Sequence, residues 1–338
     1  MTRSKRKDDH VALALQQEIQ QTNDFSLMRY VHRGLVRMNY SDVNTETTYL
    51  ARRFALPFYI NAMTGGSLKT METNRKLALI AKKYDLAMAV GSQHAALDDE
   101  SLVPSYRIVR ETYPEGFLIG NVSANATVDQ ALRAVSMIDA NALGIHINVA
   151  QELTMDEGDR DFSDWESNIA AIVKAVDVPV IVKEVGFGMS HETVSRLLAC
   201  GVAHVDVSGH GGTNFIWIEN TRSKQQRFDY LADWGISTVE SVLMTKSLQK
   251  NVEILASGGV KTPLDVMKLC TLGVKAVGVS GQFLRAAQLE EDLMFDYVDG
   301  FIHDFKLLMV LVGAKTIQDL VQCDYQLMGR LASYDEIS

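Results

Sequence analysis

The segment 142–152, ALGIHINVAQE, places a dense set of polar side chains directly after an apolar run. His146, Asn148, Gln151 and Glu152 bring four hydrogen-bonding side chains within seven residues. A strand end that packs against a core rarely contains so many such groups, because each buried polar atom needs a hydrogen-bond partner. The pattern indicates a binding or catalytic site at the end of a buried strand.

Lys183 lies inside a second apolar segment, VIVKEVG at 180–186. Burying a cation without a counter-charge is unfavourable, so this lysine needs an anionic partner. Glu184 is adjacent in the sequence, but neighbouring residues of a strand point to opposite faces. An anionic ligand is therefore a better candidate partner for Lys183 than Glu184.

Two further apolar runs end in glycine. Gly258 and Gly259 close the run VEILASGG, and Ser280 and Gly281 follow the run AVGV. Glycine lets backbone N–H groups come close to a phosphate, although it also serves in tight turns that bind nothing. Because the feature occurs after two successive runs, a phosphate site is favoured, without identifying the ligand.

The elements that must position these residues form a repeating pattern. Eight apolar runs, rich in β-branched residues, each end in small or polar residues and are followed by helical patterns; they occupy 56–66, 86–93, 117–123, 142–149, 178–186, 203–212, 252–259 and 276–284. Continuous apolar runs are typical of parallel strands buried on both faces. Eight such units in about 230 residues predict an α/β fold of the (β/α)8 TIM-barrel type. A doubly wound open sheet is the alternative, weakened because no GxGxxG motif follows the first run.

Boundary residues support the predicted helices. Ser190 and Thr262 have the chemistry of N-caps, Pro263 suits a first helical position, and Gly201 and Gly273 are candidate stops. We interpret the whole chain, 1–338, as one domain. It divides into an N-terminal extension (1–50) with a helix over roughly 9–20, a barrel (about 55–285) and C-terminal helices (about 288–338).

Composition and charge narrow the class of protein. The 338 residues are 47% hydrophobic and 22% charged, as in ordinary globular proteins. The formal net charge of -9 argues against a general nucleic-acid binder, which needs clustered positive surface. No apolar run reaches the roughly 20 residues of a membrane span, and the basic start leads into DDHVALALQQ rather than a signal-peptide core. Three separated cysteines without a framework fit a reducing cytoplasm.

The residues that close the runs are candidates for a site, because TIM-barrel enzymes react at the carboxyl ends of their strands. Small polar residues dominate there, and the arrangement resembles that of the FMN-binding barrels. The resemblance implies contacts to FMN from Ala62, Met63, Thr64, Ser92, Asn121, Lys183, Ser208, Thr213, Gly258, Gly259, Ser280 and Gly281. It also implies that Lys183 lies near the N1–O2 edge of the flavin, where a cation stabilises the anionic reduced ring.

The type of flavin enzyme is indicated by further motifs. The segment SGHGGTNF at 208–215 is similar to one in the α-hydroxy-acid oxidases, but Thr213 stands where those enzymes have a carboxylate-binding Arg. The chain resembles the type 2 isopentenyl diphosphate isomerases in RKDDH, AMTGG, GSQ, HINVAQE, VKEVGFGMS, SGHGGTNF and DWGIST. These motifs begin at residue 6 and occur in order along nearly the whole chain.

The resemblance implies a reaction and a role for each site residue. Isopentenyl and dimethylallyl diphosphate would interconvert by a 1,3-allylic proton shift on reduced FMN, with Mg²⁺ and with NADPH as reductant, in isoprenoid biosynthesis. The substrate would be bound by Arg6, Lys7, His10, His146, Asn148 and Gln151. Gln151 would also be catalytic, and Glu152 would hold Mg²⁺, which prefers few carboxylates together with phosphate oxygens. A cytoplasmic homo-oligomer is the corresponding expectation.

Some alternatives remain open at this point. Members of that family carry Arg or Met after GSQ, where this chain has His94, and the sequence does not decide whether His94 contacts the diphosphate. The acidic segment 155–165, MDEGDRDFSDW, is interpreted as a solvated loop rather than a set of metal ligands. An α-hydroxy-acid oxidase and an inert FMN- or phosphate-binding barrel are the competing functions. The intact Gln151–Glu152 pair argues against the inert barrel.

We expect the double substitution Arg6→Ala with Lys7→Ala to raise KM for the diphosphate substrate strongly and to leave FMN binding unchanged. Two charge-assisted contacts would be lost, each contributing about 1.5–3 kcal/mol. Steady-state kinetics and the flavin absorbance of the purified variant measure both quantities. Wild-type kinetics in the double variant would show that the basic cluster is only a solvated tail.

Overall fold

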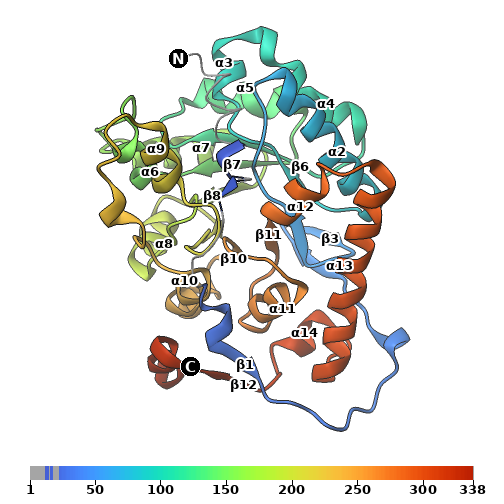
Figure 1. Cartoon of the computed structure of the whole chain (residues 1–338). Helices are drawn as coiled ribbons and strands as arrows, with labels where there is room; N and C mark the ends of the chain where they lie inside the picture. The colour runs from blue at the N-terminus through green and yellow to red at the C-terminus, as the bar shows by residue number, and fades with distance from the viewer. Residues whose placement is uncertain (1–11, 15, 18–22, 338) are drawn as a thin grey trace.

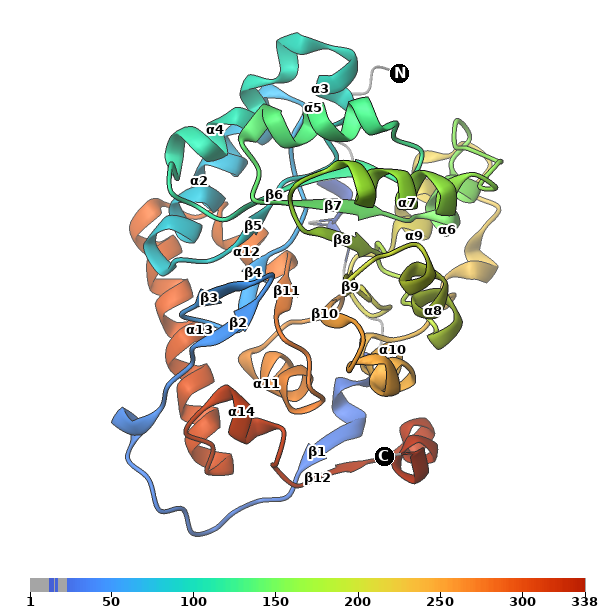
Figure 2. The same ribbon diagram turned by 180° about the vertical axis from the view of Figure 1, so that it is seen from behind.

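Eight parallel strands close into a barrel, as the sequence predicts, and helices surround it (Figures 1 and 2). The computed structural model describes residues 12–14, 16–17 and 23–337. In spatial order the barrel strands are β4 (Phe58–Ile60), β5 (Met88–Ala89), β6 (Leu118–Ser123), β7 (Ala142–His146), β8 (Val180–Lys183), β9 (His204–Asp206), β10 (Glu253–Ser257) and β11 (Val277–Val279). β11 pairs with β4 and closes the ring, so the open-sheet alternative is wrong.

Helices follow the strands along the chain. They are α2 (Leu68–Tyr84), α3 (His94–Asp98), α4 (Pro104–Thr112), α5 (Val128–Ile138), α6 (Val149–Thr154), α7 (Trp165–Ala175), α8 (His191–Ala199), α9 (Phe215–Arg222), α10 (Thr238–Thr245), α11 (Pro263–Thr271), α12 (Gly281–Ala286), α13 (Glu291–Val312) and α14 (Ile317–Leu320). The predicted caps are confirmed: Ser190 accepts a hydrogen bond from the backbone of Thr193, and Thr262 from that of Asp265. Gly201 and Gly273 adopt φ of 83° and 90°, the left-handed conformation of a helix stop.

A hairpin inserts side chains into the amino-terminal end of the barrel. Its strands are β2 (Thr47–Tyr49) and β3 (Arg52–Phe54), and both segments precede the first barrel strand. Tyr49 and Phe54 stack with ring centroids 4.1 Å apart, and Phe54 meets the edge of Phe117, just before β6, at 5.4 Å. These rings pack in one cluster with Ala142 and Ala276, at or next to the starts of β7 and β11. The hairpin therefore fills one end of the barrel and leaves the other end for a site.

The two ends of the chain also pair, which the sequence did not predict. β1 (Met28–Tyr30) forms an antiparallel pair with β12 (Tyr325–Leu327), and a 3-10 helix (Gly329–Ile337) follows. The expectation of helices alone after residue 288 is thus correct for α13 and α14 and wrong for this strand. Three-residue strands carry too little periodicity to be recognised, and their pairing depends on a segment about 300 residues away.

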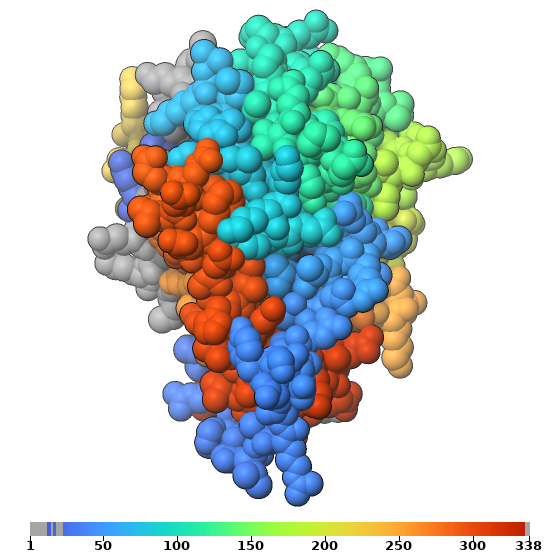
Figure 3. Space-filling model, turned by 90° about the vertical axis from the view of Figure 1, so that its right-hand side faces the viewer, coloured from blue at the N-terminus to red at the C-terminus, as the bar shows by residue number. Residues whose placement is uncertain are grey.

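The long helix α13 forms one flank of the molecule beside the N-terminal segment (Figure 3). The hydroxyl of Tyr40 and Nδ1 of His303 are 2.9 Å apart across this contact. Of the helix expected over roughly 9–20, residues 12–14 and 16 are helical and residue 17 is not, and the remaining residues lie outside the described ranges. Among the helices of the described ranges, none has both the length and the hydrophobicity of a membrane span, α13 with its 22 residues included.

Candidate active site

A cavity of about 550 Å³ opens at the carboxyl ends of the barrel strands, within the roughly 300–1,000 Å³ range of small-molecule sites. It brings together every site residue predicted from the sequence that the structure describes: Ala62, Met63, Thr64, Ser92, Asn121, His146, Asn148, Gln151, Glu152, Lys183, Ser208, Thr213, Gly258, Gly259, Ser280 and Gly281. Arg6, Lys7 and His10 lie outside the described residues. The residues that line this cavity thus come from all around the barrel, from the end of β4 to the start of α12.

The glycines after β10 allow two loops to pack closely at the cavity. A Cβ on Gly258 would lie 2.1 Å from the carbonyl oxygen of Gly209, and one on Gly259 would lie 2.8 Å from that of Gly211. Both glycines also have positive φ, 98° and 71°. A Cβ on Gly281, at the start of α12, would instead meet open space. That these glycines bind a phosphate stays a prediction.

Lys183 is buried on the cavity wall and is 9% exposed. Its Nζ donates to the backbone carbonyl of Glu184 at 2.6 Å. The Glu184 carboxylate accepts instead from the N–H groups of Val185, Gly186 and Phe187 at 2.5–2.8 Å. Burial raises the pKa of Glu184 to about 7 and lowers the pKa of Lys183. The Glu184 side chain thus binds backbone N–H groups, and that an anionic ligand is the better partner for Lys183 stays a prediction.

Asp206, the last residue of β9, was not among the residues predicted from the sequence. Its carboxylate is completely buried and accepts hydrogen bonds from the Tyr59 hydroxyl at 2.7 Å and the Ser257 hydroxyl at 2.8 Å. An acid inside the apolar run AHVDVSG was the available signal, since it raises the same question of a partner as Lys183 does.

Asn121 and two histidines form the wall between β6 and β7. Asn121 Oδ1 is 2.9 Å from Nδ1 of His146, while Asn121 Nδ2 donates to the Val90 carbonyl at 3.1 Å. The ring of His94 also lines the cavity, with Nε2 2.9 Å from the Ser123 hydroxyl. His94, which the sequence left undecided, therefore lies on the same wall as His146.

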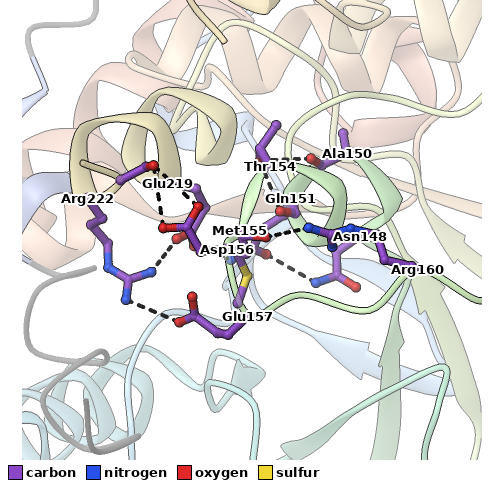
Figure 4. A network of polar contacts seen from close by, with 11 residues as sticks. Asn148, Ala150, Gln151, Thr154, Met155, Asp156, Glu157, Arg160, Glu219 and Arg222 are labelled. Atoms are coloured by element: carbon purple, nitrogen blue, oxygen red, sulfur yellow. Dashed lines mark hydrogen bonds and ion pairs between the residues drawn. The ribbon is translucent and has the colours of Figure 1, made fainter. Parts of the chain in front are cut away.

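Gln151 is held by partners on both ends of its amide (Figure 4). Asn148 Nδ2 donates to Gln151 Oε1 at 3.2 Å, and Gln151 Nε2 donates to Oε1 of Glu219 at 3.0 Å. Glu219 is a buried residue of α9 and forms an ion pair with Arg222. Arg222 also meets the exposed Glu157 at 3.4 Å. Glu219 lies in no recognisable sequence motif, because only the packing of α6 against α9 brings it to Gln151.

Glu152 is arranged as a single carboxylate at the rim of the cavity. Its Oε1 accepts from Asn148 Nδ2 at 2.8 Å, and its Oε2 accepts from the backbone of Asp159 at 2.9 Å. Arg160 folds the acidic loop by donating to the carbonyls of Glu152 and Met155, both at 2.7 Å. In the described part of the chain, no set of three His, Cys, Asp or Glu residues could hold a metal ion. A cation at Glu152 would need oxygen ligands from substrate or water, as Mg²⁺ commonly does.

The acidic loop is not only a solvated segment. Its Glu157 and Asp159 are exposed, as expected, but both contribute to the lining of the cavity. The loop must turn back toward Glu152, because a Cβ on Gly158 would lie 2.0 Å from the Glu152 carbonyl oxygen.

Comparisons with known proteins agree with this geometry. The profile of the FMN-dependent dehydrogenase family matches residues 106–326. The isopentenyl-diphosphate delta-isomerase of Staphylococcus haemolyticus (strain JCSC1435) is 47% identical over 337 residues, covering 99% of this chain and 96% of that protein. Among solved structures, a flavocytochrome b2 variant with sulfite bound superposes with a TM-score of 0.68 at 18% identity, covering 92% of this chain and 81% of that one. A mandelate oxidase variant with benzaldehyde gives 0.65 at 16% identity, covering 94% and 90%. At such identities the structural likeness shows the fold alone.

We expect Glu219→Gln to lower kcat with isopentenyl diphosphate at least about tenfold, because a charge-assisted hydrogen bond that orients the Gln151 amide is worth roughly 1.5–3 kcal/mol. FMN content, measured by absorbance, should stay at the wild-type level. Glu157→Gln is the matched control, since an exposed ion-pair partner contributes about 0–1 kcal/mol. A Glu219→Gln variant with kcat within about twofold of the wild type would remove Glu219 from the positioning of Gln151.

Proposed function

The chain belongs to the isopentenyl-diphosphate delta-isomerase family, and we propose that it interconverts isopentenyl and dimethylallyl diphosphate by a 1,3-allylic proton shift on reduced FMN. One observation carries the proposal. Gln151, oriented by Asn148 and Glu219, faces the same cavity as the flavin-type residues Lys183 and Asn121. An amide is too weak an acid or base to move a carbon-bound proton unaided. Gln151 therefore needs a second group for proton transfer, and a flavin in the same cavity would supply it.

The residues present fit FMN. The glycines after β10 and the start of α12 would take the phosphate, while Asn121, Ser92 and Thr64 would meet the ring. Lys183 would lie at the edge where negative charge collects on reduction. Reduced FMN supplies an electron-rich ring and an acid–base group, so a double bond can migrate without net oxidation.

The polar residues beside Gln151 suit a diphosphate. His146 and Asn148 present an imidazole and an amide to the cavity, and Arg6, Lys7 and His10 would add charge from the N-terminal segment. Glu152 would hold Mg²⁺ together with diphosphate oxygens, which neutralises part of the substrate charge. Gln151 would orient the alkene and relay or position the proton that leaves C2.

The chain lacks the arginine with which α-hydroxy-acid oxidases bind the substrate carboxylate. Thr213 lines the cavity at the position where α-hydroxy-acid oxidases carry a carboxylate-binding Arg, and a hydroxyl cannot form the bidentate contact. NADPH as the reductant, a cytoplasmic location and assembly into a homo-oligomer are further parts of the proposal, drawn from the resemblance.

We expect turnover to need reduced FMN but to consume no reductant. Anaerobic enzyme reduced once with NADPH or dithionite should form many products per reductant oxidised, with solvent deuterium entering the allylic product. Gln151→Ala should keep a reducible flavin and lose most isomerisation. One reductant oxidised per product, or full activity with oxidised FMN, would contradict the scheme and reopen the oxidoreductase alternative.

Glu152→Gln should raise the Mg²⁺ concentration for half-maximal activity by roughly tenfold or more, because a hard cation loses its anionic protein ligand. The flavin spectrum should not change. Asp161→Asn, in the same acidic loop but away from Glu152, serves as control. An unchanged Mg²⁺ midpoint in Glu152→Gln would exclude Glu152 as the metal ligand.

A further inference from the structure

Asp206 lies beneath the cavity at the centre of a hydrogen-bond network. It is 0% exposed, and its carboxylate is bonded by the Tyr59 hydroxyl, the Ser257 hydroxyl and the backbone N–H of Ser208, the last at 3.0 Å. Each of these groups donates to it, as an ionised carboxylate requires. The network joins β4, β9 and β10 under the segments that line the cavity.

The β8–β9 ladder places Asp206 opposite Lys183. The two residues are register partners, and residues in register on parallel strands project to the same face of the sheet. Burial lowers the pKa of Lys183, and Asp206, followed by Glu184, is the charge that opposes this shift. Two charges buried side by side stabilise each other only as a pair, so each depends on the other.

Other groups near Lys183 supply less of this counter-charge. The Glu184 carboxylate opposes the Lys183 shift less than Asp206 does, and it is hydrogen-bonded to three backbone N–H groups. His146, the register partner of Lys183 on β7, contacts Asn121 and is no anion. Burial, and then the Asp206 carboxylate, raise the pKa of Tyr59 well above its usual range, so Tyr59 stays neutral. Asp206 is thus the main counter-charge of Lys183 when the flavin is uncharged.

We infer that Asp206 is a positioning residue that keeps Lys183 protonated in both redox states of the flavin, so that the charge facing the ring is fixed before FMN is reduced. The inference rests on the proposed function only in placing FMN in the cavity beside Lys183. It goes beyond the direct flavin contacts, because Asp206 does not line the cavity.

Asp206 also stabilises the backbone conformation of Ser208, a residue of the cavity wall. Ser208, which lines the cavity, has a positive φ of 36°, and its N–H donates to Asp206. Such a conformation is uncommon outside glycine and persists where surrounding contacts impose it. Asn in place of Asp206 removes the charge, retains one acceptor oxygen for this N–H and replaces the other oxygen with an amide donor, which the Tyr59 and Ser257 hydroxyls can accept. Asp206→Asn is therefore the informative variant.

Removal of the Asp206 charge should change the number of protons that the protein takes up when FMN is reduced. Without the carboxylate, the buried Lys183 ammonium lacks its main counter-charge until reduction makes the flavin anionic. Above its lowered pKa, Lys183 in Asp206→Asn would lose its proton in the oxidised protein and regain it on reduction. Reduction would then take up one more proton per two electrons than in the wild type, and the midpoint potential of FMN would fall more steeply with pH.

The experiment is anaerobic spectroelectrochemistry of the purified holoprotein over a range of pH, which needs bound FMN but no turnover. We expect the steeper slope in Asp206→Asn and a smaller change in Glu184→Gln, because Asp206 is the larger opposing charge on Lys183. The slope should return to wild type in Asp206→Asn with Lys183→Arg, since a guanidinium stays charged. A wild-type slope in Asp206→Asn, or a steeper slope in Glu184→Gln than in Asp206→Asn, would overturn the inference.

A second measurement tests the inference even in variants that lose FMN or are destabilised. If Asp206 serves to balance Lys183, chemical unfolding should show Asp206→Asn destabilised and the double variant with Lys183→Met restored toward the wild type. Additive losses in this double-mutant cycle would overturn the inference. Because the cycle uses neither substrate nor turnover, failure of isomerase activity would count against the proposed function and leave the Lys183–Asp206 test intact.

Discussion

Closure of the barrel brings the strand ends, and with them the site residues, to one rim. The strands are short, from two to six residues, and each one ends at the same rim because β11 pairs back onto β4. Residues separated by more than 200 positions, such as Met63 and Gly281, therefore line one cavity. Parallel pairing also buries both faces of the sheet, so polar side chains are concentrated at the strand ends, where a ligand can satisfy them.

Several charges are buried within this frame, and each is stabilised differently. Glu184 is bound by three backbone N–H groups, Glu219 by Arg222 and the Gln151 amide, and Asp206 by two hydroxyls and a backbone N–H group. Removing one partner from such an arrangement is strongly unfavourable, whereas the complete arrangement orients its members. The same contacts that make these carboxylates tolerable hold Gln151 and Lys183 in position toward the cavity.

Both ends of the chain take part in building the site. Asn23 donates to the carbonyl of Gly259 at 3.0 Å, and the backbone of Asn214 donates to Gln17 at 3.1 Å. Asp24, just after Asn23, is bound by Arg330 at 2.8 Å from the C-terminal segment. The N-terminal segment is therefore fastened beside the glycines of the cavity, and the basic cluster Arg6–Lys7 lies in the sequence that leads to it.

The barrel, its eight strands and most of the residues at their ends could be predicted, because continuous apolar runs and strand-end polar groups are local patterns of the sequence. The buried lysine in VIVKEVG and the cluster HINVAQE were recognisable for the same reason. The hydrogen bond of Glu219 to Gln151, the register that places Asp206 beside Lys183, and the pairing of β1 with β12 could be learned only from the fold. These contacts join segments that no periodicity or spacing connects, and they exist because barrel closure and helix packing bring the segments side by side.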